Sequence, residues 1–523
     1  MNNGKICVSV CAKTADELIE QIKRAEELAD VIEIRFDGLE TFNLENVSDR
    51  LLISKLQKFN KPFLATFRAF EEGGAKPITL DKDRIPFWEN LNLDLSKFAD
   101  FVDCEWELLS NVTHNWRFYK NIKNSEIVCS FHNFYSPIND FNNLANIFSQ
   151  MSNLKLIGST GHTNCYTERP PLSPNIFKIV VKTDEITDSI AIWKLLQFAK
   201  SENKPIIPIA MGESGKWTRI LGLAHGAFMT YASLDSDKET APGQVTARDL
   251  IEVYRAKELD ETTDVYGILG SNTGVSLSPL IHNTAFKFHK LNSVFVPLQV
   301  HNLDEFIKRM VKPETREVDL NFKGFAVTIP HKQSIIKHLD YLDETAEKIG
   351  AVNTVKIIDG KLYGYNTDAQ GFIEPLKQVY GSLENAKVAI LGAGGSAKAC
   401  GFALEKEKAI VTVFDGNQVR SSEFKTQNFS QFDIIVNTTP LGMRGKFEGE
   451  TPLQAEQIKG VKLIYDLVYT PFQTQFMNEA DKVDVPKISG MAMLIAQALE
   501  QQKIWTGLDA PMKEISAQVL KKL

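Results

Sequence analysis

Apolar strand-like segments alternate with amphipathic helix-like segments through the first 250 residues, and this alternation constrains the fold more than any other feature. One of the helical patterns is TADELIEQIKRAEELA, which Thr14 and Glu17 open as a capping box. The predicted strands span residues 5–11, 31–37, 62–68, 101–107, 126–132, 176–182, 205–211 and 226–232. Eight strand–helix repeats in about 250 residues are typical of a (β/α)8 barrel, a TIM barrel.

The pattern restarts after a polar, acidic stretch at residues 257–264. A new strand is predicted at 265–269, so we expect a barrel domain at 1–258 and a second α/β half at 263–523. Within that half, AKVAILGAGGSAKACGFALEKEKAIVTVFD (386–415) has the order strand, glycine turn, helix, strand. This is the order of a Rossmann-type dinucleotide-binding βαβ unit. We therefore expect a substrate lobe at 263–370 and a dinucleotide-binding lobe at 371–523, whose last helices return to the substrate lobe.

Composition narrows the classes of function. The 523 residues are 43% apolar and 24% charged, as in ordinary globular proteins. A net charge of -7 gives no support to nucleic-acid or anionic-membrane partners, and no apolar run reaches the length of a spanning helix. The chain enters a strand almost at once, which leaves no room for a targeting peptide. The six cysteines lack metal or redox spacing, so we expect reduced thiols, no metal site and a cytoplasmic protein.

The predicted strand IFKIVVK at 176–182 carries a lysine among side chains that suit a strand buried on both faces. A buried ammonium group is costly unless it is paired or loses its proton. The alternative is a lysine at a strand end whose side chain reaches the surface. Lys182 shares a face with Lys178 and lies nearer the strand end, so periodicity alone does not choose between them.

Further polar residues gather at predicted strand ends, where a (β/α)8 barrel places its chemistry. They are Glu33 and Arg35 on the second strand, Arg68 at the end of the third, Asp103 and Glu105 on the fourth, and His132 at the end of the fifth. Any one of them has a structural ion pair as its alternative. Two cations near a buried lysine favour its free amine, and an amine beside a histidine is suited to Schiff-base chemistry on a ketone.

Seven blocks follow one another over residues 5–255: VIEIRFD, FLATFRAFEEGG, VDCEWEL, SFHNF, FKIVVK, PIAMGESGKWTR and ETAPGQ. Together they resemble type I 3-dehydroquinate dehydratase. The resemblance implies that Lys178 forms an imine with the substrate ketone, that His132 is the general acid/base and that Asp103 orients it. The implied substrate-binding residues are Glu33, Arg35, Arg68, Arg219 and Gln244, with Glu72, Met211 and Thr240 as neighbours.

A second series of blocks runs through residues 263–523: GSNTGVSLSPLIHN, GFAVTIPHK, GAVNT, GYNTDAQG, GAGGSAKA, NTTPLGM, YDLVYTP and GMAMLIAQA. Together they resemble shikimate dehydrogenase, although capping serines, a surface lysine and an Asx-turn are alternatives for single positions. The resemblance implies that Lys332 and Asp368 transfer the proton at the substrate oxygen. The implied substrate-binding residues are Ser276, Ser278, Thr328, Asn353, Tyr469 and Gln497. The implied cofactor-binding residues are Gly392, Ala393, Gly394, Gly395, Ser396, Ala397, Asp415, Thr438 and Gly490.

Two positions depart from this family. Ala326 replaces an asparagine, which should cost little if that side chain only supports the site. Asp415-Gly416-Asn417 replaces the family's Asn-Arg-Thr clamp for the 2′-phosphate of NADP, and an acid there suits a free ribose hydroxyl. The expected cofactor is therefore NADP or NAD, with Asp415 favouring NAD, although Arg420 or Lys425 could reach a 2′-phosphate from the following turn.

The two resemblances imply consecutive steps of the shikimate pathway of aromatic amino acid biosynthesis, in which 3-dehydroquinate is dehydrated and 3-dehydroshikimate is then reduced to shikimate. One alternative is a second half that works in the oxidative direction as a quinate or shikimate dehydrogenase. Another is a non-catalytic sensor of the quinate pathway, which should have lost one of Lys178, His132, Lys332 and Asp368. All four are present. We therefore expect a multifunctional lyase and oxidoreductase with small-molecule partners.

Overall fold

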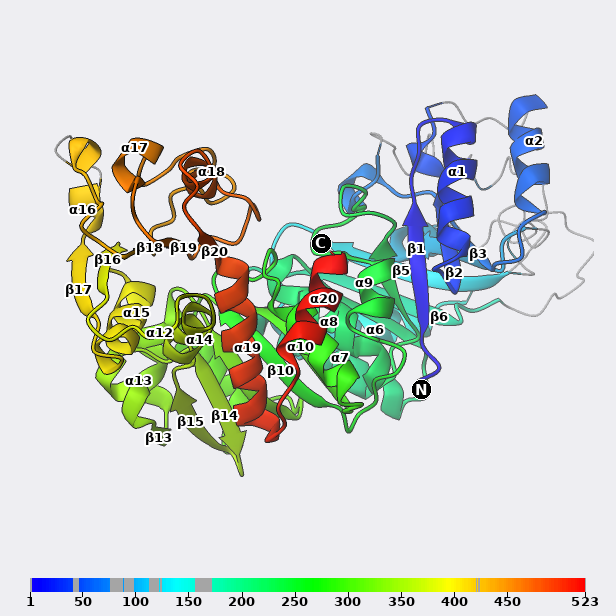
Figure 1. Ribbon diagram of the computed structural model, residues 1–523. Coiled ribbons are helices and arrows are strands. Elements are labelled where there is room, and N and C mark those ends of the chain that lie inside the picture. The colour runs from blue at the N-terminus through cyan, green and yellow to red at the C-terminus, as the bar shows by residue number, and fades with distance from the viewer. Residues whose placement is uncertain are drawn as a thin grey trace, which may run out of the picture. The chain divides into compact units, whose positions relative to one another are not determined.

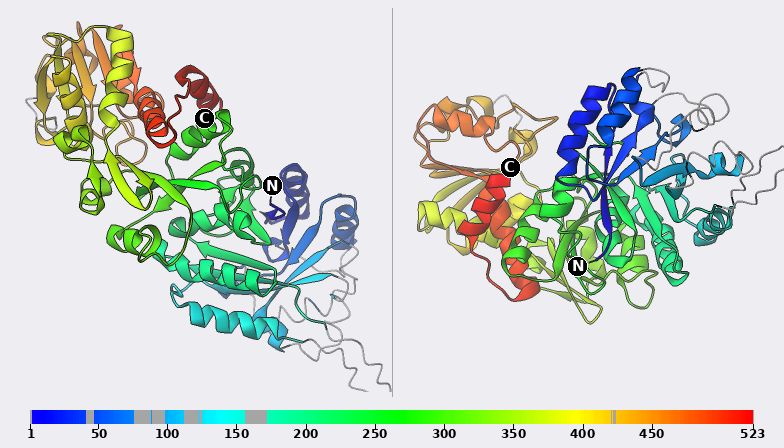
Figure 2. Two further views of the ribbon diagram at one scale, coloured as in Figure 1. Left: turned by 90° about the horizontal axis from the view of Figure 1, so that it is seen from below. Right: turned by 90° about the vertical axis from the view of Figure 1, so that its right-hand side faces the viewer.

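The computed structural model describes residues 2–40, 47–75, 88, 98–111, 122, 125–155, 172–419, 421 and 424–522 (Figures 1 and 2). The chain forms two compact units. The first comprises Met1–Val265, Leu269–Ser276 and Asn292–Asn321, and the second comprises Tyr266–Ile268, Leu277–Leu291 and Phe322–Leu523. In the part of the chain that the structure describes, no helix combines the length and apolarity needed to cross a membrane.

Eight parallel strands form the centre of the first unit. They are β1 (Lys5–Val10), β2 (Val31–Arg35), β3 (Phe63–Thr66), β4 (Phe101–Glu105), β5 (Glu126–Asn133), β6 (Ile176–Lys182), β7 (Ile206–Met211) and β8 (Met229–Ser233). They pair in chain order, and β1 pairs with both β2 and β8. The backbone N–H of Phe228, next to β8, donates to the carbonyl of Ile206 in β7 at 2.8 Å. The sheet thus closes into a barrel between β7 and β8.

All eight predicted strands are confirmed, with ends that move by three residues or fewer. The second strand is shorter than predicted because residues Phe36–Gly38 turn into a 3-10 helix. The described helices within residues 1–265 of this unit are α1 (Ala15–Glu26), α2 (Val47–Leu56), α4 (Trp106–Asn111), α6 (Phe141–Ser152), α7 (Ser189–Ser201), α8 (Lys216–Leu221) and α9 (Ala247–Glu252). Of the predicted capping box, Thr14 caps α1 by accepting the Glu17 N–H at 3.3 Å, whereas the Glu17 side chain accepts the N–H of Lys13 and not that of Thr14.

The strand period of two builds two layers inside the barrel. An apolar layer includes Cys7, Val31, Leu64, Phe101, Val128 and Ile176. Two residues further along each of these strands stand Ser9, Glu33, Thr66, Asp103, Ser130 and Lys178, all buried. Because alternate residues of a strand point to the same face, this polar layer lies directly above the apolar one, towards the carboxyl ends of the strands.

The chain then enters β10 (Asp264–Gly270), α10 (Ser278–Phe288), β11 (Ser293–Gln299) and α11 (Leu303–Phe306). In the second unit, β12 (Phe322–Val327), β14 (Thr354–Ile358), β15 (Lys361–Tyr365) and β13 (Tyr341–Leu342) are neighbours in that order. The pairs β12–β14 and β14–β15 are antiparallel, whereas β13–β15 is parallel. The short helices α12 (His331–Ser334) and α13 (Glu344–Ile349) connect these strands.

A five-stranded parallel sheet completes the second unit. Its order is β17 (Ile410–Phe414), β16 (Lys387–Leu391), β18 (Ile434–Asn437), β19 (Leu463–Asp466) and β20 (Lys487–Ser489). The associated helices are α14 (Asp368–Tyr380), α15 (Gly395–Lys406), α16 (Gly416–Val419), α17 (Ala455–Ile458), α18 (Gln475–Asp481), α19 (Gly490–Thr506) and α20 (Met512–Lys522). Val388 and Ile390 belong to one apolar core, and Ala389 and Leu391 belong to another. The sheet is therefore covered on both faces, by α14 and α15 below and by α17 and α18 above in Figure 1, as the predicted Rossmann-type lobe requires.

Candidate active sites

Lys178 lies inside the barrel and its side chain does not reach the surface. The residue is 5% exposed, whereas the Lys182 side chain is 38% exposed and pairs with Asp184 at 3.0 Å. The Lys178 Nζ lies 3.1 Å from Asp103 Oδ2, 3.8 Å from Glu33 Oε1 and 3.9 Å from the centre of the Tyr231 ring. Of the two lysines that share this strand face, only Lys178 is enclosed.

We expected two cations next to Lys178, and this prediction is wrong. The two charged groups that contact its Nζ are carboxylates. The arginines are engaged elsewhere. Arg68 Nη2 donates to the same Asp103 Oδ2 at 2.6 Å, and Arg35 forms a two-point contact with Asp37 at 2.9 and 2.7 Å. A buried charge is costly without an opposite partner, so acids and bases alternate in this layer.

Asp103 is the shared acceptor of the polar layer. Its Oδ2 accepts hydrogen bonds from Arg68 and Lys178, and its Oδ1 accepts one from the Ser130 hydroxyl at 2.6 Å. Burial opposes ionisation of this carboxyl group, but the charges of Arg68 and Lys178 and the bond from Ser130 outweigh it and lower the pKa of Asp103 to about 2. Asp103 therefore stays ionised at all physiological pH values and holds Lys178 in place.

His132 faces the same pocket with a side chain that is 6% exposed. Its Nδ1 lies 2.9 Å from Glu72 Oε2 and 3.2 Å from Arg68 Nη1. The Glu72 carboxylate can only accept and the Arg68 guanidinium can only donate. Glu72 is the closer partner, and Arg68 Nη1 has a nearer acceptor in the Ser130 hydroxyl at 2.9 Å, so the hydrogen is assigned to Nδ1 and Nε2 keeps a free lone pair. Burial, followed by the positive charges of Arg68, Lys178 and Arg35, lowers the pKa of His132 well below 6.5. The neutral imidazole can act as a base at neutral pH.

The prediction that Asp103 orients His132 is therefore wrong, since Glu72 occupies that place. Asp103 lies one layer deeper, at the level of Lys178, whereas Glu72 follows β3 at the barrel mouth. Sequence spacing could not separate the two acids, because both belong to strand ends whose order around the barrel appears only in the fold.

Arg219 is a further buried cation of the pocket. It is 2% exposed, its Nη2 contacts only the Pro242 carbonyl at 3.4 Å, and among the described residues its Nε has no hydrogen-bond partner. Burial lowers the pKa of Arg219 to about 10, against the opposing influence of Glu239. A buried guanidinium with unused donors is a ready site for an anion. Gln244 and Thr240 bond to each other beside it, at 3.1 Å.

These residues line one pocket at the carboxyl ends of the strands. Its lining contains Lys178, His132, Glu33, Arg35, Arg68, Glu72, Met211, Arg219, Thr240 and Gln244, all of them predicted from the sequence. Sequence reasoning missed Ser9, Phe134 and Tyr231, which line it too. The signal for Ser9 was available, because it stands two residues after Cys7, in the same alternation that places Lys178 after Ile176.

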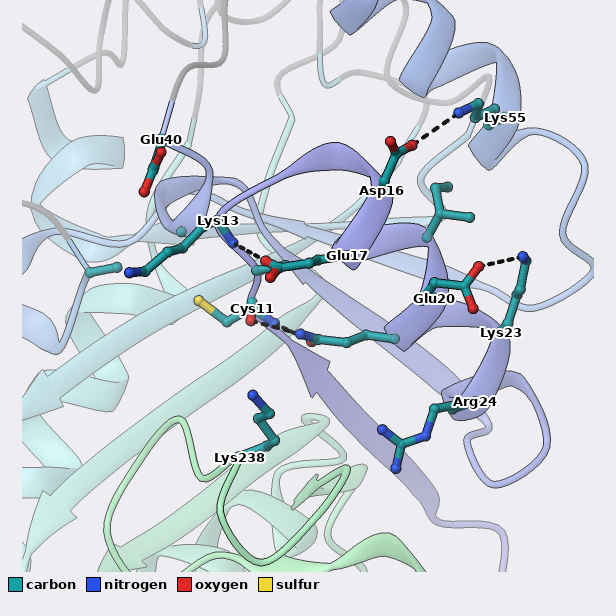
Figure 3. A pocket seen from close by; sticks show the side chains of 15 residues that line it. Cys11, Lys13, Asp16, Glu17, Glu20, Lys23, Arg24, Glu40, Lys55 and Lys238 are labelled. Carbon is teal, nitrogen blue, oxygen red and sulfur yellow. Dashed lines mark hydrogen bonds and ion pairs between the residues drawn. The ribbon is translucent and has the colours of Figure 1, made fainter.

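A larger hollow beside α1 has a different character (Figure 3). Several of its charges are already paired on the helix surface, with Asp16 near Lys55 at 3.5 Å and Glu20 near Lys23 at 2.6 Å. Glu17 accepts the backbone N–H of Lys13. These pairs are exposed and are screened by water. The hollow therefore lacks the buried, converging groups that distinguish the Lys178 pocket.

The second site is centred on a short ion pair between Lys332 Nζ and Asp368 Oδ2, 2.5 Å apart. Lys332 follows β12, and Asp368 is the first residue of α14. Asn353 Nδ2 donates to the other oxygen of Asp368 at 2.7 Å and to Gln497 Oε1 at 3.4 Å. Asn366 accepts the backbone N–H of Asp368 at 3.0 Å. Four predicted residues thus meet at one point: Lys332, Asp368, Asn353 and Gln497.

For the remaining predicted substrate residues, the structure gives the position in the fold and the burial. Ser278 is the first residue of α10 and is buried, and Tyr469 packs against an apolar cluster that includes Ile281 on that helix. Thr328 is half-buried four residues before Lys332. Ser276 is half-buried as well and belongs to the first compact unit.

The glycine turn between β16 and α15 has the backbone that its sequence predicts. Gly392 has φ +117°, and a Cβ there would lie 2.3 Å from Thr438 Oγ1. Gly394 and Gly395 face open space, where a Cβ would meet nothing within 4 Å. Ala393 and Ser396 complete the turn and Ala397 is buried in α15. This open, amide-lined cradle at the start of a 12-residue helix fits the pyrophosphate of a dinucleotide.

Asp415 lies at the end of β17 with an exposed side chain. Its Oδ1 accepts the N–H groups of Asn417 and Gln418, each at 2.8 Å, so Asp415 caps α16. One carboxylate oxygen is thus committed to the backbone, which weakens the argument that this acid is present for a ribose. Arg420 lies outside the described residues, as do the Lys425 side chain and Cys165. Gly490 opens α19, where a Cβ would approach the Leu467 carbonyl to 2.3 Å.

Fold and sites together define a class: a barrel lyase with an enclosed lysine, joined to a dehydrogenase with a Rossmann-type lobe. Residues 6–157 and 159–261 match the family model of type I 3-dehydroquinase, and residues 268–355 match that of the shikimate dehydrogenase substrate binding domain. A bifunctional 3-dehydroquinate dehydratase/shikimate dehydrogenase from Arabidopsis thaliana, named as chloroplastic, is 32% identical over 100% of this chain and 85% of its own. The chain belongs to the bifunctional 3-dehydroquinate dehydratase/shikimate dehydrogenase family.

Two single-function relatives match the second half alone. A shikimate dehydrogenase (NADP(+)) of Caldanaerobacter subterraneus is 38% identical over 48% of this chain and 94% of its own. One from Methanocaldococcus jannaschii is 35% identical over 51% of this chain and 99% of its own. The second half of the chain therefore corresponds to an enzyme type that also occurs as a separate protein, and the sensor and purely oxidative alternatives are not favoured.

Proposed function

We propose that Lys178 and His132 carry out the dehydratase reaction of this family. The observation that carries the proposal is that an enclosed lysine and a neutral, oriented histidine share one pocket. The Lys178 amine attacks the C3 ketone of 3-dehydroquinate and forms an imine, with loss of water. His132 Nε2 then removes a proton from the adjacent carbon, and the resulting enamine expels the C1 hydroxyl as a second water, which His132 helps to protonate. Hydrolysis of the product imine releases 3-dehydroshikimate and frees Lys178.

The remaining pocket residues hold the substrate in this proposal. Arg219 takes the carboxylate, because its buried donors have no acidic partner within ion-pair distance among the described residues. Gln244, Thr240, Glu33 and Arg35 are placed to bond the hydroxyl groups, and Met211 forms part of the apolar wall. Glu72 keeps the hydrogen of His132 on Nδ1, so that Nε2 faces the substrate.

In the second half, Lys332 and Asp368 act as the proton-transfer pair. When NADPH is bound it supplies the hydride for the ketone of 3-dehydroshikimate. The oxygen that gains negative charge takes a proton from the Lys332 ammonium, which Asp368 keeps charged and directed. Asn353 and Gln497 fix Asp368 and bond the substrate hydroxyls, and Ser276, Ser278, Thr328 and Tyr469 bind its other groups.

NADP is the cofactor that we assign. The shikimate dehydrogenase relatives are named as NADP(+) enzymes, and the open cradle at Gly394 and Gly395 fits a pyrophosphate. The expected preference for NAD was based on Asp415 alone. Because the Asp415 side chain serves as a helix cap, its presence is explained without a ribose contact.

The two domains meet between residues 258 and 263 in this proposal. The matches to the two family models end at residue 261 and begin at residue 268, which supports a junction there. The described cysteines are free thiols, as in a reducing compartment, and we propose the cytoplasm as the location.

Trapping of the imine tests the barrel chemistry. Sodium borohydride added with 3-dehydroquinate should reduce the imine to a stable amine on Lys178, and peptide mass spectrometry locates it. Lys178→Ala should abolish both trapping and dehydration. Lys182→Ala is the matched control, since that lysine is exposed on the same strand face, and it should leave both intact. An adduct on Lys182, or full dehydration by Lys178→Ala, would show that the assignment is wrong.

A further inference from the structure

Helices α10 and α19 lie side by side (Figure 1). Between them, three buried polar residues form a cluster that the proposed reaction does not use. His282 lies on α10, and Gln501 and Gln502 lie on α19, all with 1% exposure or less. The His282 Nε2 is 3.2 Å from Gln501 Oε1, and its Nδ1 is 3.0 Å from Gln502 Oε1. Burying three polar side chains is costly, so their placement between two helices calls for a physical reason.

The Gln501 amide has only one possible orientation. Its Nε2 donates to the backbone carbonyl of Asn353 at 3.0 Å, and a carbonyl can only accept. Gln501 Oε1 must therefore face His282 and accept from it. His282 consequently carries its hydrogen on Nε2.

The second glutamine completes the assignment. Burial lowers the pKa of His282 to about 4, so its ring is neutral and Nδ1 is a bare acceptor. An Oε1 atom opposite that lone pair would be repelled, and Gln502 Nε2 has no hydrogen-bond partner among the described residues. Oxygen and nitrogen of an amide are assigned from their partners, and exchanging them in Gln502 turns the repulsion into an N–H···N bond. Gln502 then donates to His282, which donates to Gln501, which donates to Asn353.

This chain of donors ends at the proton-transfer pair. Asn353 Nδ2 donates to Asp368 Oδ1 at 2.7 Å, and Asp368 Oδ2 holds Lys332. The cluster also ties together three elements that carry proposed substrate ligands: α10 begins at Ser278, β14 follows Asn353, and α19 carries Gln497. We propose that His282 and Gln501 are positioning residues of the dehydrogenase site, which fix the Asn353 peptide and thereby the geometry of Asp368 and Lys332. The inference rests on the proposed function of that pair.

Substitutions in the full chain test this inference. Gln501→Leu and His282→Leu should lower kcat/KM for shikimate by up to about 100-fold, the cost of a small misplacement of catalytic groups. The KM for NADP+ and the dehydratase activity should change less than about twofold. His282→Gln keeps an N–H at a similar distance from the backbone and should recover most of the loss. Gln502→Leu is the matched control: it is equally buried on the same helix but does not touch Asn353, and it should stay within about threefold of the parent.

The outcomes distinguish the proposed function of the Lys332–Asp368 pair from the positioning role of the cluster. Parent activity that depends on Lys332 supports the proposed function whatever the cluster does. Equal losses in Gln501→Leu and Gln502→Leu, or lower melting temperatures with unchanged kcat/KM, would mean that the cluster only stabilises the fold. A variant that does not fold leaves the parent protein for a direct measurement, in which 15N NMR should find His282 neutral with its hydrogen on Nε2. The Nδ1–H form or an imidazolium would overturn the assignment.

Discussion

The buried charged side chains inside the barrel are each held by direct ion pairs or hydrogen bonds to neighbouring residues. Arg68 shows this most fully, because it touches Asp103 and Glu105 in the barrel, Glu72 at the mouth and the Ser130 hydroxyl. Removing Arg68 would take away the cation that these three carboxylates share, which costs more than the net value of any single pair. His132 stays neutral in this arrangement, since burial and the positive charges of Arg68, Lys178 and Arg35 oppose its protonation.

The neutrality of His132 can be measured by NMR titration of its imidazole. The midpoint should lie well below 6.5, the value for an unfolded histidine, because burial and the neighbouring cations oppose protonation. The folded state then binds fewer protons than the unfolded state, so the free energy of unfolding should fall as the pH drops from 6.5 through the folded pKa. His132→Gln should show a smaller fall over that window. A midpoint at or above 6.5 would remove the basis for His132 as a base at neutral pH.

At the scale of elements, the β16–turn–α15 unit contains glycines that are present for two different reasons. Gly392 is required by the backbone, since its φ of +117° and the 2.3 Å approach to Thr438 leave no room for a side chain. Thr438 cannot simply move away, because its hydroxyl donates to the Leu391 carbonyl at 2.8 Å. Gly394 has an ordinary φ of −78° and open surroundings, so the reason for its glycine lies outside the folded chain.

Alanine substitutions should distinguish these two reasons. Gly392→Ala should destabilise the protein by roughly 1–3 kcal/mol, the usual cost of a strained backbone position. Gly394→Ala should change stability by less than about 0.5 kcal/mol and should weaken NADP+ binding about tenfold or more, because the new methyl group occupies space left for the pyrophosphate. Thermal unfolding and titration with NADP+ measure the two effects. Unchanged affinity in Gly394→Ala would show that the dinucleotide does not pass there.

At the scale of the whole molecule, the two proposed sets of reacting groups lie in different compact units. The barrel set surrounds Lys178 in the first compact unit, and the Lys332–Asp368 pair with its supports lies in the second. No residue of one set contributes a described hydrogen bond to the other. Each chemical step should therefore respond to its own substitutions only.

A coupled assay checks this independence and the cofactor together. Given 3-dehydroquinate and NADPH, the parent chain should oxidise NADPH, and NADH should serve less well. Lys178→Ala should block the reaction from 3-dehydroquinate and leave that from 3-dehydroshikimate unchanged. Lys332→Ala should lower reduction by roughly 10²–10⁴-fold, the usual contribution of a positioned proton donor, while dehydration continues. Equal use of NADH would contradict the cofactor assignment, and loss of both activities in either variant would contradict separate sites.

The family resemblance supplied five lining residues of the Lys178 pocket: Glu72, Met211, Arg219, Thr240 and Gln244. The sequence patterns by themselves predicted the eight strands, the βαβ unit and five further lining residues: Glu33, Arg35, Arg68, His132 and Lys178. This was possible because hydrophobic periodicity and turn chemistry are local, and because a (β/α)8 barrel brings all strand ends to one face. Which side chains touch is a property of the closed barrel. The contact of Glu72 with His132 and the carboxylates at Lys178 depend on how neighbouring elements meet, and spacing along the chain does not encode that. The cap at Asp415 is local, because its acceptor oxygen bonds the N–H groups two and three residues further on. The His282–Gln501–Asn353 chain joins residues 219 and 148 positions apart, so only the packing of α10 against α19 could reveal it.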